Sequence, residues 1–296
     1  MSQVLYRILN IAVFLSCLAL PLAVVRAQDS ELVASLEVLD GGVTIQRAAT
    51  SGFVLVNFES LVGVGDVIKT AADGRARITF FANGVETDVL PNSEFRIDAF
   101  SGSEERYQLT VTLIVGQTAQ RVLKVLDSGS SYIINSTGLE LAVRGTVFDT
   151  RVERSGRSAT IVRDGAVKAR NVGTAGVADV PAGFGVRAEQ GKGLSDVVRA
   201  ASFAQLDSAI DGCNGVIETI GDVVLNVRIG PGLTFEKIGT LDNLTAQRLY
   251  GVTETTQWYR VMFEGKFAWV FAPAVKLDSA CAGLRRFPDD TPAEQR

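Results

Sequence analysis

The chain has 296 residues, of which 47% are hydrophobic and 21% are charged, and its formal net charge is −4. This apolar content excludes a disordered polymer, and the length suits about two domains with packed cores. The acidic balance makes nucleic acid an unexpected partner. Because the sequence contains no histidine, it cannot form Ser-His-Asp or Cys-His catalytic arrangements or a histidine-based metal site. The 29 glycines favour a turn-rich, mainly β protein.

Residues 1–27 have the pattern of a secretory signal peptide, which we expect to be cleaved. Arg7 precedes an apolar run over residues 11–20, and residues 25–27 form a small-residue cleavage site. Polar residues and a proline interrupt the run, which disfavours a membrane anchor, and Cys17 lies in a poor context for a lipoprotein site. Cleavage would remove two arginines and shift the net charge from −4 to −6. Since no second run approaches the length of a membrane span, we expect an exported protein, periplasmic or extracellular.

Two cysteines, Cys213 and Cys281, would be left in the exported chain. An even pair in an oxidising compartment most simply forms a disulfide, and these two bracket one segment of the chain. Closing a loop of that length contributes roughly 4 kcal/mol in the chain-entropy account. Two free thiols are the alternative.

Residues 32–188 form short alternating runs separated by Gly, Asp and Asn, and this pattern predicts about a dozen strands and no long helix. Residues 76–81 place Ala76, Ile78 and Phe80 on one face, and residues 109–115 alternate in the same way. The dipeptide Asp164-Gly165 stands between two such runs and predicts a β-hairpin. Further turns are predicted at Asp73-Gly74 and Asn83-Gly84.

Residues 194–211 break this alternation. Their apolar residues recur at helical spacing and Gly212 follows, which predicts a helix connecting the β-rich region to a smaller domain. That domain would occupy residues 212–282 and contain both cysteines. Residues 283–296 are polar and contain proline, and we expect them to form a flexible tail.

Five segments of the β-rich region occur together, in this order, in one known domain family. They are GGVTIQR (41–47), VGVGDVIKTAADGRARITFFANG (62–84), LAVRGTVFDTRV (141–152), VRDGAVKAR (162–170) and VPAGFGV (180–186). With them, residues 32–188 resemble the FecR domain, named for the iron-citrate sensing regulator. Asn83 departs from the family, which more often has Asp there, but it preserves the turn chemistry. The resemblance implies an all-β, twisted, solenoid-like stack of short strands.

Two motifs in this region have both a structural and a functional interpretation. Gly145, in VRGT, would let another backbone approach closely, and Arg144 would satisfy carbonyls or a carboxylate. The alternative is that Arg144 and Thr146 contact a ligand. Asp66 is interpreted as a turn-capping carboxylate, with a catalytic role as the alternative.

Residues 212–282 contain a second set of motifs: VLNVRIGPG (224–232), KIGTL (237–241), WYRVMFEGKFAWV (258–270) and VKL (275–277). Together they resemble the bacterial SH3-like domain, which implies a small β-barrel. Leu225 and Val227 would point into its core. Gly230, Pro231 and Gly232 would form a tight turn, since Pro fixes φ and Gly tolerates unusual values. Arg228 would bridge the loop that follows.

The two tryptophans of the chain, Trp258 and Trp269, both fall in this segment. We expect Trp269 to pack, although Ala268 replaces the glycine that the family usually has there. For Trp258, followed by Tyr259, packing and exposure in a ligand groove are both open. Trp258, Tyr259 and Arg228 are therefore the candidate ligand-binding residues. Members of the SH3-like family often recognise cell-wall peptide or glycan, which the resemblance implies here.

The sequence favours a non-catalytic exported protein with no expected catalytic residue, metal or cofactor. Its partner would be peptidoglycan or an envelope protein, bound by the SH3-like domain, with the FecR-like domain as an interaction or sensing scaffold. The alternative is a structural or assembly protein of an envelope complex without cell-wall affinity. In the founding FecR regulators the domain follows a cytoplasmic sigma-factor-binding segment, whereas here the expected signal leads directly into it. We therefore do not expect sigma-factor binding. The oligomeric state is left open.

Overall fold

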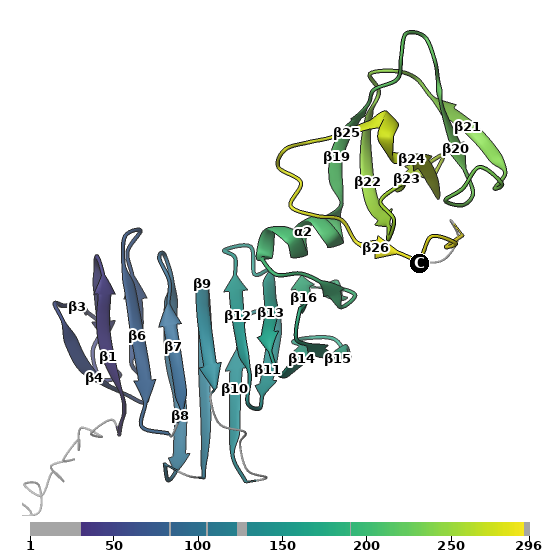
Figure 1. Ribbon diagram of the computed structural model, residues 1–296. Helices are drawn as coiled ribbons and strands as arrows, with labels where there is room; N and C mark the ends of the chain where they lie inside the picture. Colours follow the sequence, from purple (N-terminus) through teal and green to yellow (C-terminus); the bar gives the residue numbers. More distant parts are fainter. Residues whose placement is uncertain (1–30, 83, 105, 123–128, 190, 293–296) are drawn as a thin grey trace, which may run out of the picture. The chain divides into compact units, whose positions relative to one another are not determined.

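The computed structural model describes residues 31–292, except residues 83, 105, 123–128 and 190 (Figure 1). The predicted signal peptide and Asn83 therefore lie outside the described residues. The described chain is mainly β, as predicted, and α2 (Phe203–Asp211) is its one α-helix. No helix in this part of the chain is long and apolar enough to cross a membrane. All described residues belong to one compact unit that begins at Glu31.

The first eighteen strands form two sheets. In sheet A the strands lie in the order β4, β1, β6, β7, β9, β12, β13, β16, and both β17 and β18 pair with β16. In sheet B the order is β3, β2, β5, β8, β9, β10, β11, β14, β15, and only β9 and β10 are parallel. The strands are β1 (Leu32–Asp40), β2 (Val43–Gln46), β3 (Phe53–Val56), β4 (Glu59–Gly63), β5 (Val67–Thr70), β6 (Arg75–Phe80), β7 (Val85–Val89), β8 (Glu94–Gly102), β9 (Tyr107–Val122), β10 (Ser131–Asn135), β11 (Leu139–Val143), β12 (Val147–Val152), β13 (Ser158–Asp164), β14 (Ala166–Asn171), β15 (Val177–Pro181), β16 (Phe184–Glu189), β17 (Gly193–Leu194) and β18 (Val198–Arg199).

Strand β9 belongs to both sheets and joins them into one hydrogen-bonded system. Up to Val115 it pairs with β8 and β10 in sheet B, and from Gly116 onward it pairs with β7 and β12 in sheet A. Gly116 has a φ of +101°, and a Cβ there would lie 2.2 Å from the Ser93 hydroxyl oxygen. Only glycine fits this bend, because the backbone conformation and the close neighbour both exclude a side chain.

The core lies between the two sheets. In β6, Ala76, Ile78 and Phe80 are buried, whereas the residues between them are not, as the alternation predicted. Phe95 and Ile97 from sheet B belong to the same buried cluster. Each large apolar side chain buried in this way contributes about 1.5–3 kcal/mol.

Asp164 and Gly165 do not form the predicted hairpin. β13 ends at Asp164 and pairs in sheet A, whereas β14 begins at Ala166 and pairs in sheet B. Gly165, with a φ of +78°, carries the chain from one sheet to the other. A Cβ there would lie 2.5 Å from the carbonyl oxygen of Gly145. Because the chain changes sheet at such crossings, this region contains sixteen described strands, β1 to β16, whereas about a dozen were predicted.

The predicted helix over 194–211 is confined to its second half. Residues 193–194 and 198–199 form β17 and β18, which extend sheet A beside β16. The helix begins after Ser202, whose hydroxyl accepts a hydrogen bond from the backbone N–H of Gln205 at 3.2 Å. Because this cap fixes where the helix starts, the residues before it lie outside the helix and extend sheet A.

The remaining eight strands form a separate sheet. Their order is β21, β20, β24, β23, β22, β19, β25, with β26 beside β22. The described pairings do not join β21 to β25, so the implied closed barrel is not shown. The strands are β19 (Cys213–Ile217), β20 (Leu225–Arg228), β21 (Lys237–Leu241), β22 (Ala246–Thr253), β23 (Trp258–Phe263), β24 (Lys266–Phe271), β25 (Val275–Leu277) and β26 (Arg286–Phe287), with a short 3₁₀ helix, η1 (Ala272–Ala274), between β24 and β25.

The predicted disulfide between Cys213 and Cys281 is present. The residues that follow it do not form the predicted flexible tail, because β26 pairs in parallel with β22 and Phe287 is only 6% exposed. Although this segment is mostly polar, it contains the large apolar side chain of Phe287, and burial of that side chain favours an ordered strand. Residues 293–296 lie outside the described residues.

The crossing at Gly165 can be tested against Gly183, which has a similar φ of +82° but no other atom within 4 Å of the place that a Cβ would take. We expect Gly183→Ala to lose about 1 kcal/mol of unfolding free energy from backbone strain alone. Gly165→Ala should lose roughly 2 kcal/mol more, because the Gly145 carbonyl must also move. Denaturant unfolding of both variants measures the difference. Equal losses would show that the close approach is unimportant.

Candidate functional site

Helix α2 is anchored to sheet A by a buried arginine. Arg187, on β16, has a side chain only 5% exposed, and its Nη1 donates to Asp207 at 3.0 Å and to Asp211 at 2.7 Å. Arg151, on β12, also donates to Asp207, at 2.7 Å. The hydrogen bond from Arg187 lowers the pKa of Asp211, and the same bond raises the pKa of Arg187. This buried cation also pairs with Glu189 of its own strand at 3.2 Å, and its pairs with the two carboxylates of α2 hold the helix in one position.

The C-terminal end of the helix is also tied to the C-terminal sheet. Arg248, on β22, donates through Nε to the backbone carbonyl of Asp211 at 3.0 Å and through Nη1 to the Asn214 side chain at 2.9 Å. A cation suits this place, because the last carbonyls of a helix carry partial negative charge. The disulfide at Cys213 follows directly.

The C-terminal segment then returns past the helix. After Cys281, the backbone N–H of Ala282 donates to the Ser208 hydroxyl at 3.4 Å. Further along, the N–H of Val252 donates to the carbonyl of Arg285 at 2.9 Å. The segment therefore lies between α2 and β22 and is bonded to both.

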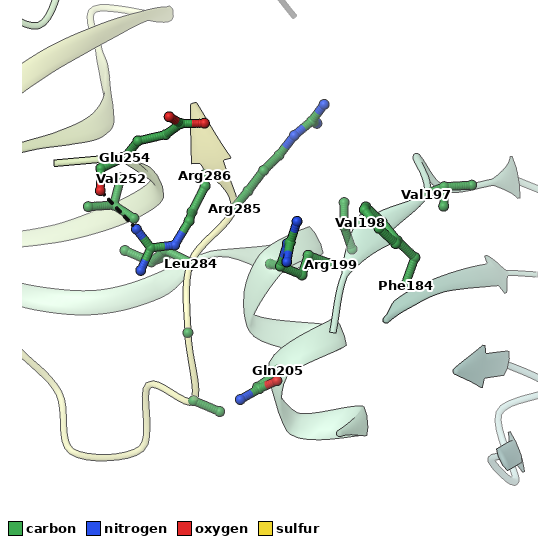
Figure 2. Close-up of a pocket in the computed structure, with 13 residues that line it drawn as sticks. Phe184, Val197, Val198, Arg199, Gln205, Val252, Glu254, Leu284, Arg285 and Arg286 are labelled. Atoms are coloured by element: carbon green, nitrogen blue, oxygen red, sulfur yellow. Dashed lines mark hydrogen bonds between the residues drawn. The ribbon is translucent and has the colours of Figure 1, made fainter. Parts of the chain in front are cut away.

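A groove of about 700 Å³ opens between these elements (Figure 2). Figure 2 shows Arg199 and Gln205 on the side of the helix, and Leu284, Arg285 and Arg286 on the side of the C-terminal segment. We call it the arginine groove. Its polar lining is Arg199, Gln205, Glu254, Arg285 and Arg286, and its apolar lining includes Phe184, Val197, Val252 and Leu284.

The arginine groove has a surplus of positive charge. Arg285 pairs with Asp196 at 2.7 Å. Arg286 donates to the backbone carbonyl of Glu254 at 3.0 Å, and the guanidinium of Arg199 lies 5.4 Å from the centre of the Phe184 ring. Neither Arg199 nor Arg286 pairs with a carboxylate of the described residues. Two unneutralised guanidinium groups beside an apolar wall can bind the carboxylate of a partly apolar ligand.

The side chains that line the arginine groove could bind charged groups of a ligand. The sequence contains no histidine, and the described residues contain no group of three side chains suited to hold a metal ion. The polar lining consists of arginines, one amide and Glu254, which could accept an ammonium group of the same ligand.

Trp258, which was predicted as a possible groove residue, is buried, and so is Trp269, which was expected to pack. Trp269 is fully buried and Trp258 nearly so. The Trp258 ring packs edge-on against Phe271, with ring centres 5.7 Å apart. Tyr259 points to the opposite face of β23, where it packs on the main core of this sheet, because successive residues of a strand alternate. The structure therefore does not bring Trp258 and Tyr259 together on one surface.

The C-terminal segment covers the tryptophan face. Phe287 packs edge-on against Trp269, with ring centres 5.8 Å apart. The guanidinium of Arg260 lies 3.9 Å from the centre of the Phe267 ring and 4.7 Å from that of Phe287. Burial, with a smaller contribution from Arg285, lowers the pKa of Arg260. This face is an aromatic core closed by β26, which explains why it offers no open groove.

Arg228 is placed as a structural residue. Its Nη1 donates to the carbonyl of Phe235 at 2.7 Å, which bridges the loop after β20. Within that loop the N–H of Gly232 donates to the carbonyl of Gly230 at 3.0 Å, and Pro231 lies between them. These contacts fit the folding role that the sequence suggested for the motif.

The two ambiguous motifs of the N-terminal region are also engaged in structure. Asp66 is fully buried and accepts hydrogen bonds from the backbone N–H of Gly63 at 3.0 Å and from Arg47 at 2.7 Å. Thr146 donates to the carbonyl of Ala166 at 2.8 Å. Arg144 is exposed. Asp66 therefore caps a turn, and Thr146 fastens the crossing near Gly165.

The arginine groove was not predicted from the sequence. Its arginines come from a segment predicted as helix and from one predicted as a flexible tail. The sequence signal that could have indicated this segment is the Arg285-Arg286 pair between Leu284 and Phe287. Apolar residues on both sides can hold such a segment against the protein while the arginine head groups stay in water.

The described chain is thus mainly β and has a groove beside α2. Within it, residues 66–168 match the family described as FecR protein, which supports that part of the resemblance. No curated protein matches the chain. Two crystal structures of a candidate anti-sigma factor from Parabacteroides distasonis are similar at 15% and 14% identity, cover 53% and 52% of this chain and 68% and 67% of their own, and give TM-scores of 0.38 and 0.37. Likeness at this level does not define function.

Replacing Phe287 tests whether the C-terminal segment is part of the core. We expect Phe287→Ala to lower the unfolding free energy by about 3 kcal/mol, because a buried ring against Trp269 is lost. The matched control is Phe271→Ala, whose ring also contacts a tryptophan but is 42% exposed, and it should lose about 1 kcal/mol. Denaturant unfolding followed by tryptophan fluorescence measures both. If both variants lost a similarly small amount of unfolding free energy, the C-terminal segment would be a flexible tail and not part of the core.

Replacing Arg187 tests the anchor of α2. We expect Arg187→Met to lower the unfolding free energy at pH 7 by about 3 kcal/mol, whereas Arg170→Met, at an exposed pair with Glu140, should change it little. Because the pKa of Asp211 is lowered in the folded state, its contribution is complete above a pH of about 4 and is lost as the pH falls through that lowered pKa. The stability difference between wild type and Arg187→Met should therefore shrink in acid. A pH-independent difference would contradict the charge pairing.

Proposed function

We propose that this chain is an exported, non-catalytic binding protein of the cell envelope, which binds a carboxylate-bearing peptide in the arginine groove. The observation that carries the proposal is the presence of Arg199 and Arg286, without carboxylate partners in the described residues, beside the apolar wall of a groove of about 700 Å³. A ligand carboxylate would pair with these guanidinium groups, an apolar side chain would lie on Phe184 or Leu284, and an amine would meet Glu254.

The FecR match supports a sensing or regulatory scaffold as the general class. The two N-terminal sheets share one buried core, and α2 carries part of the groove. The disulfide between Cys213 and Cys281 supports export, because such bonds persist in oxidising compartments.

We also propose that the C-terminal sheet is a bacterial SH3-like domain. In support, the motif LNVR occupies β20, KIGTL occupies β21, and the two tryptophans lie on β23 and β24. The ligand would be bound by the groove that β26 and α2 form, and Trp258 would serve the core. Cell-wall stem peptides fit this chemistry, since they carry free carboxylates, amines and small apolar side chains. A peptide segment of an envelope protein with a free or side-chain carboxylate has the same chemistry.

A second candidate function is structural: an assembly protein that binds only other proteins. The observation that favours it is the exposed apolar edge at β3, where Val54 and Leu55 are exposed. Such an edge is typical of strand pairing between chains.

Co-sedimentation with purified sacculi tests the favoured function. We expect the wild-type protein to be retained and the double variant Arg199→Ala with Arg286→Ala to bind at least about tenfold more weakly, since two charge-assisted contacts are lost. The charge-matched control, Arg154→Ala with Lys237→Ala, changes two exposed cations outside the groove and should bind normally.

Soluble arms of the same experiment separate the ligand sources. Stem peptides should compete for binding, whereas glycan chains stripped of peptide should not. If wild type is not retained and stem peptides do not bind, cell-wall recognition is wrong. Binding of an acidic envelope-protein peptide that depends on Arg199 and Arg286 would then assign the groove to a protein segment.

A further inference from the structure

The N-terminal end of the two sheets has two open edges. Among the described strands, β3 pairs only with β2, and β4 pairs only with β1. β3 therefore presents backbone N–H and carbonyl groups that no described strand satisfies, whereas on β4 the Leu61 carbonyl accepts a hydrogen bond from Arg47 at 2.7 Å. Proteins usually protect such edges with charge, proline or a covering element, because a free edge is a template for another strand.

The edge at β3 is apolar as well as open. Val54 is 66% exposed, Leu55 61% and Phe58 81%, and Phe53 and Leu61 are also exposed. No charged residue occurs from residue 48 to residue 58. Scattered exposed apolar residues are ordinary, but a contiguous group on an edge strand marks an interaction surface. A hollow of about 550 Å³, lined in part by Val54 and Phe58, lies beside β3.

The opposite end of each sheet is protected. In sheet B the last strand is β15, which carries Asp179 and ends at Pro181. In sheet A, α2 packs beside the last strands, because Phe203 and Leu206 belong to one buried cluster with Val198 of β18. Within the two N-terminal sheets, β3 differs from these protected ends because it carries no charged residue and no proline.

We propose that β3 pairs antiparallel with β3 of a second copy, so that the two N-terminal ends form a symmetric dimer. A two-fold axis perpendicular to the sheet leaves each side chain on the same face of the sheet. Because residues that lie opposite each other in paired strands point to the same face, the axis must pass beside one residue, which then lies opposite the same residue of the second copy. Placed at Val54, it sets Val54 opposite Val54 of the second copy and Phe53 opposite Leu55 of the second copy. No like charges would meet, because the strand has no charged residue. Since the opposite ends are protected, the contact closes as a dimer and does not continue as a filament.

The available area suits a second copy that binds weakly. The five exposed apolar side chains offer an area on the order of 500 Å² per copy. Two copies would remove about 1,000 Å², which is the lower limit of a specific interface. The dimer should therefore form with a dissociation constant in the range of about 1–100 µM and be concentration-dependent. This inference is independent of the arginine groove, whose residues lie elsewhere in the chain.

Sedimentation velocity of the purified protein over about 1–200 µM tests the dimer. We expect a concentration-dependent shift from monomer to dimer in the wild type, and at least about a tenfold weaker association in Leu55→Lys, because a charge would be brought opposite an apolar strand. The control is Val177→Lys on the protected edge β15, also at an exposed position, which should dimerise like wild type.

The substituted side chains at positions 55 and 177 are exposed, so both variants should keep the wild-type circular dichroism spectrum. A wild-type protein that stays monomeric across this range would overturn the proposal. So would a dimer that Leu55→Lys leaves intact, since the contact would then lie on another surface. An intermolecular disulfide formed on mild oxidation of Val54→Cys, and not of the control Val177→Cys, would support the register.

Discussion

The buried pairing of Arg187 with Asp207 and Asp211 is the interaction on which the candidate site depends. It fixes α2 on the last strands of sheet A, with Arg187 donating at 3.0 Å and 2.7 Å to the two carboxylates. The helix then leads into Cys213, and the disulfide brings the C-terminal segment back beside it. Arg199 and Arg286 belong to distant parts of the sequence, and this chain of contacts, together with the Arg285–Asp196 pair, brings both to one groove.

The β scaffold is held by the way its chain changes sheets. Strand β9 passes from sheet B to sheet A at Gly116, and the chain crosses again at Gly165. Each crossing ties the two layers covalently, while the alternating apolar residues fill the space between them. The scaffold is therefore a stable support for surfaces at its ends, the arginine groove and the open edge at β3.

Local sequence patterns predicted those features that depend on local chemistry. The alternation in residues 76–81 predicted a half-buried strand, and the cysteine pair predicted the disulfide. Both the two-residue alternation and the even number of cysteines in the expected exported chain can be seen in the sequence. Asp164-Gly165 predicted a hairpin, and Gly165 does adopt a positive φ, but β14 joins the other sheet, since a turn dipeptide does not specify which sheet the next strand joins. The segment after Cys281 was predicted as a tail because its composition is polar, and one residue, Phe287, overrides that composition by packing on Trp269. The groove could not be predicted, because its arginines meet only through tertiary contacts.

Under the proposed function, the guanidinium groups of Arg199 and Arg286 bind the carboxylate of the ligand. The most direct measurement is an NMR titration that follows the arginine Nε–Hε resonances while a short peptide with a free carboxylate is added. The account predicts saturable shifts at Arg199 and Arg286, with Arg170 on β14 unchanged. Shifts that are absent from both groove arginines, or that are equal at Arg170, would contradict it.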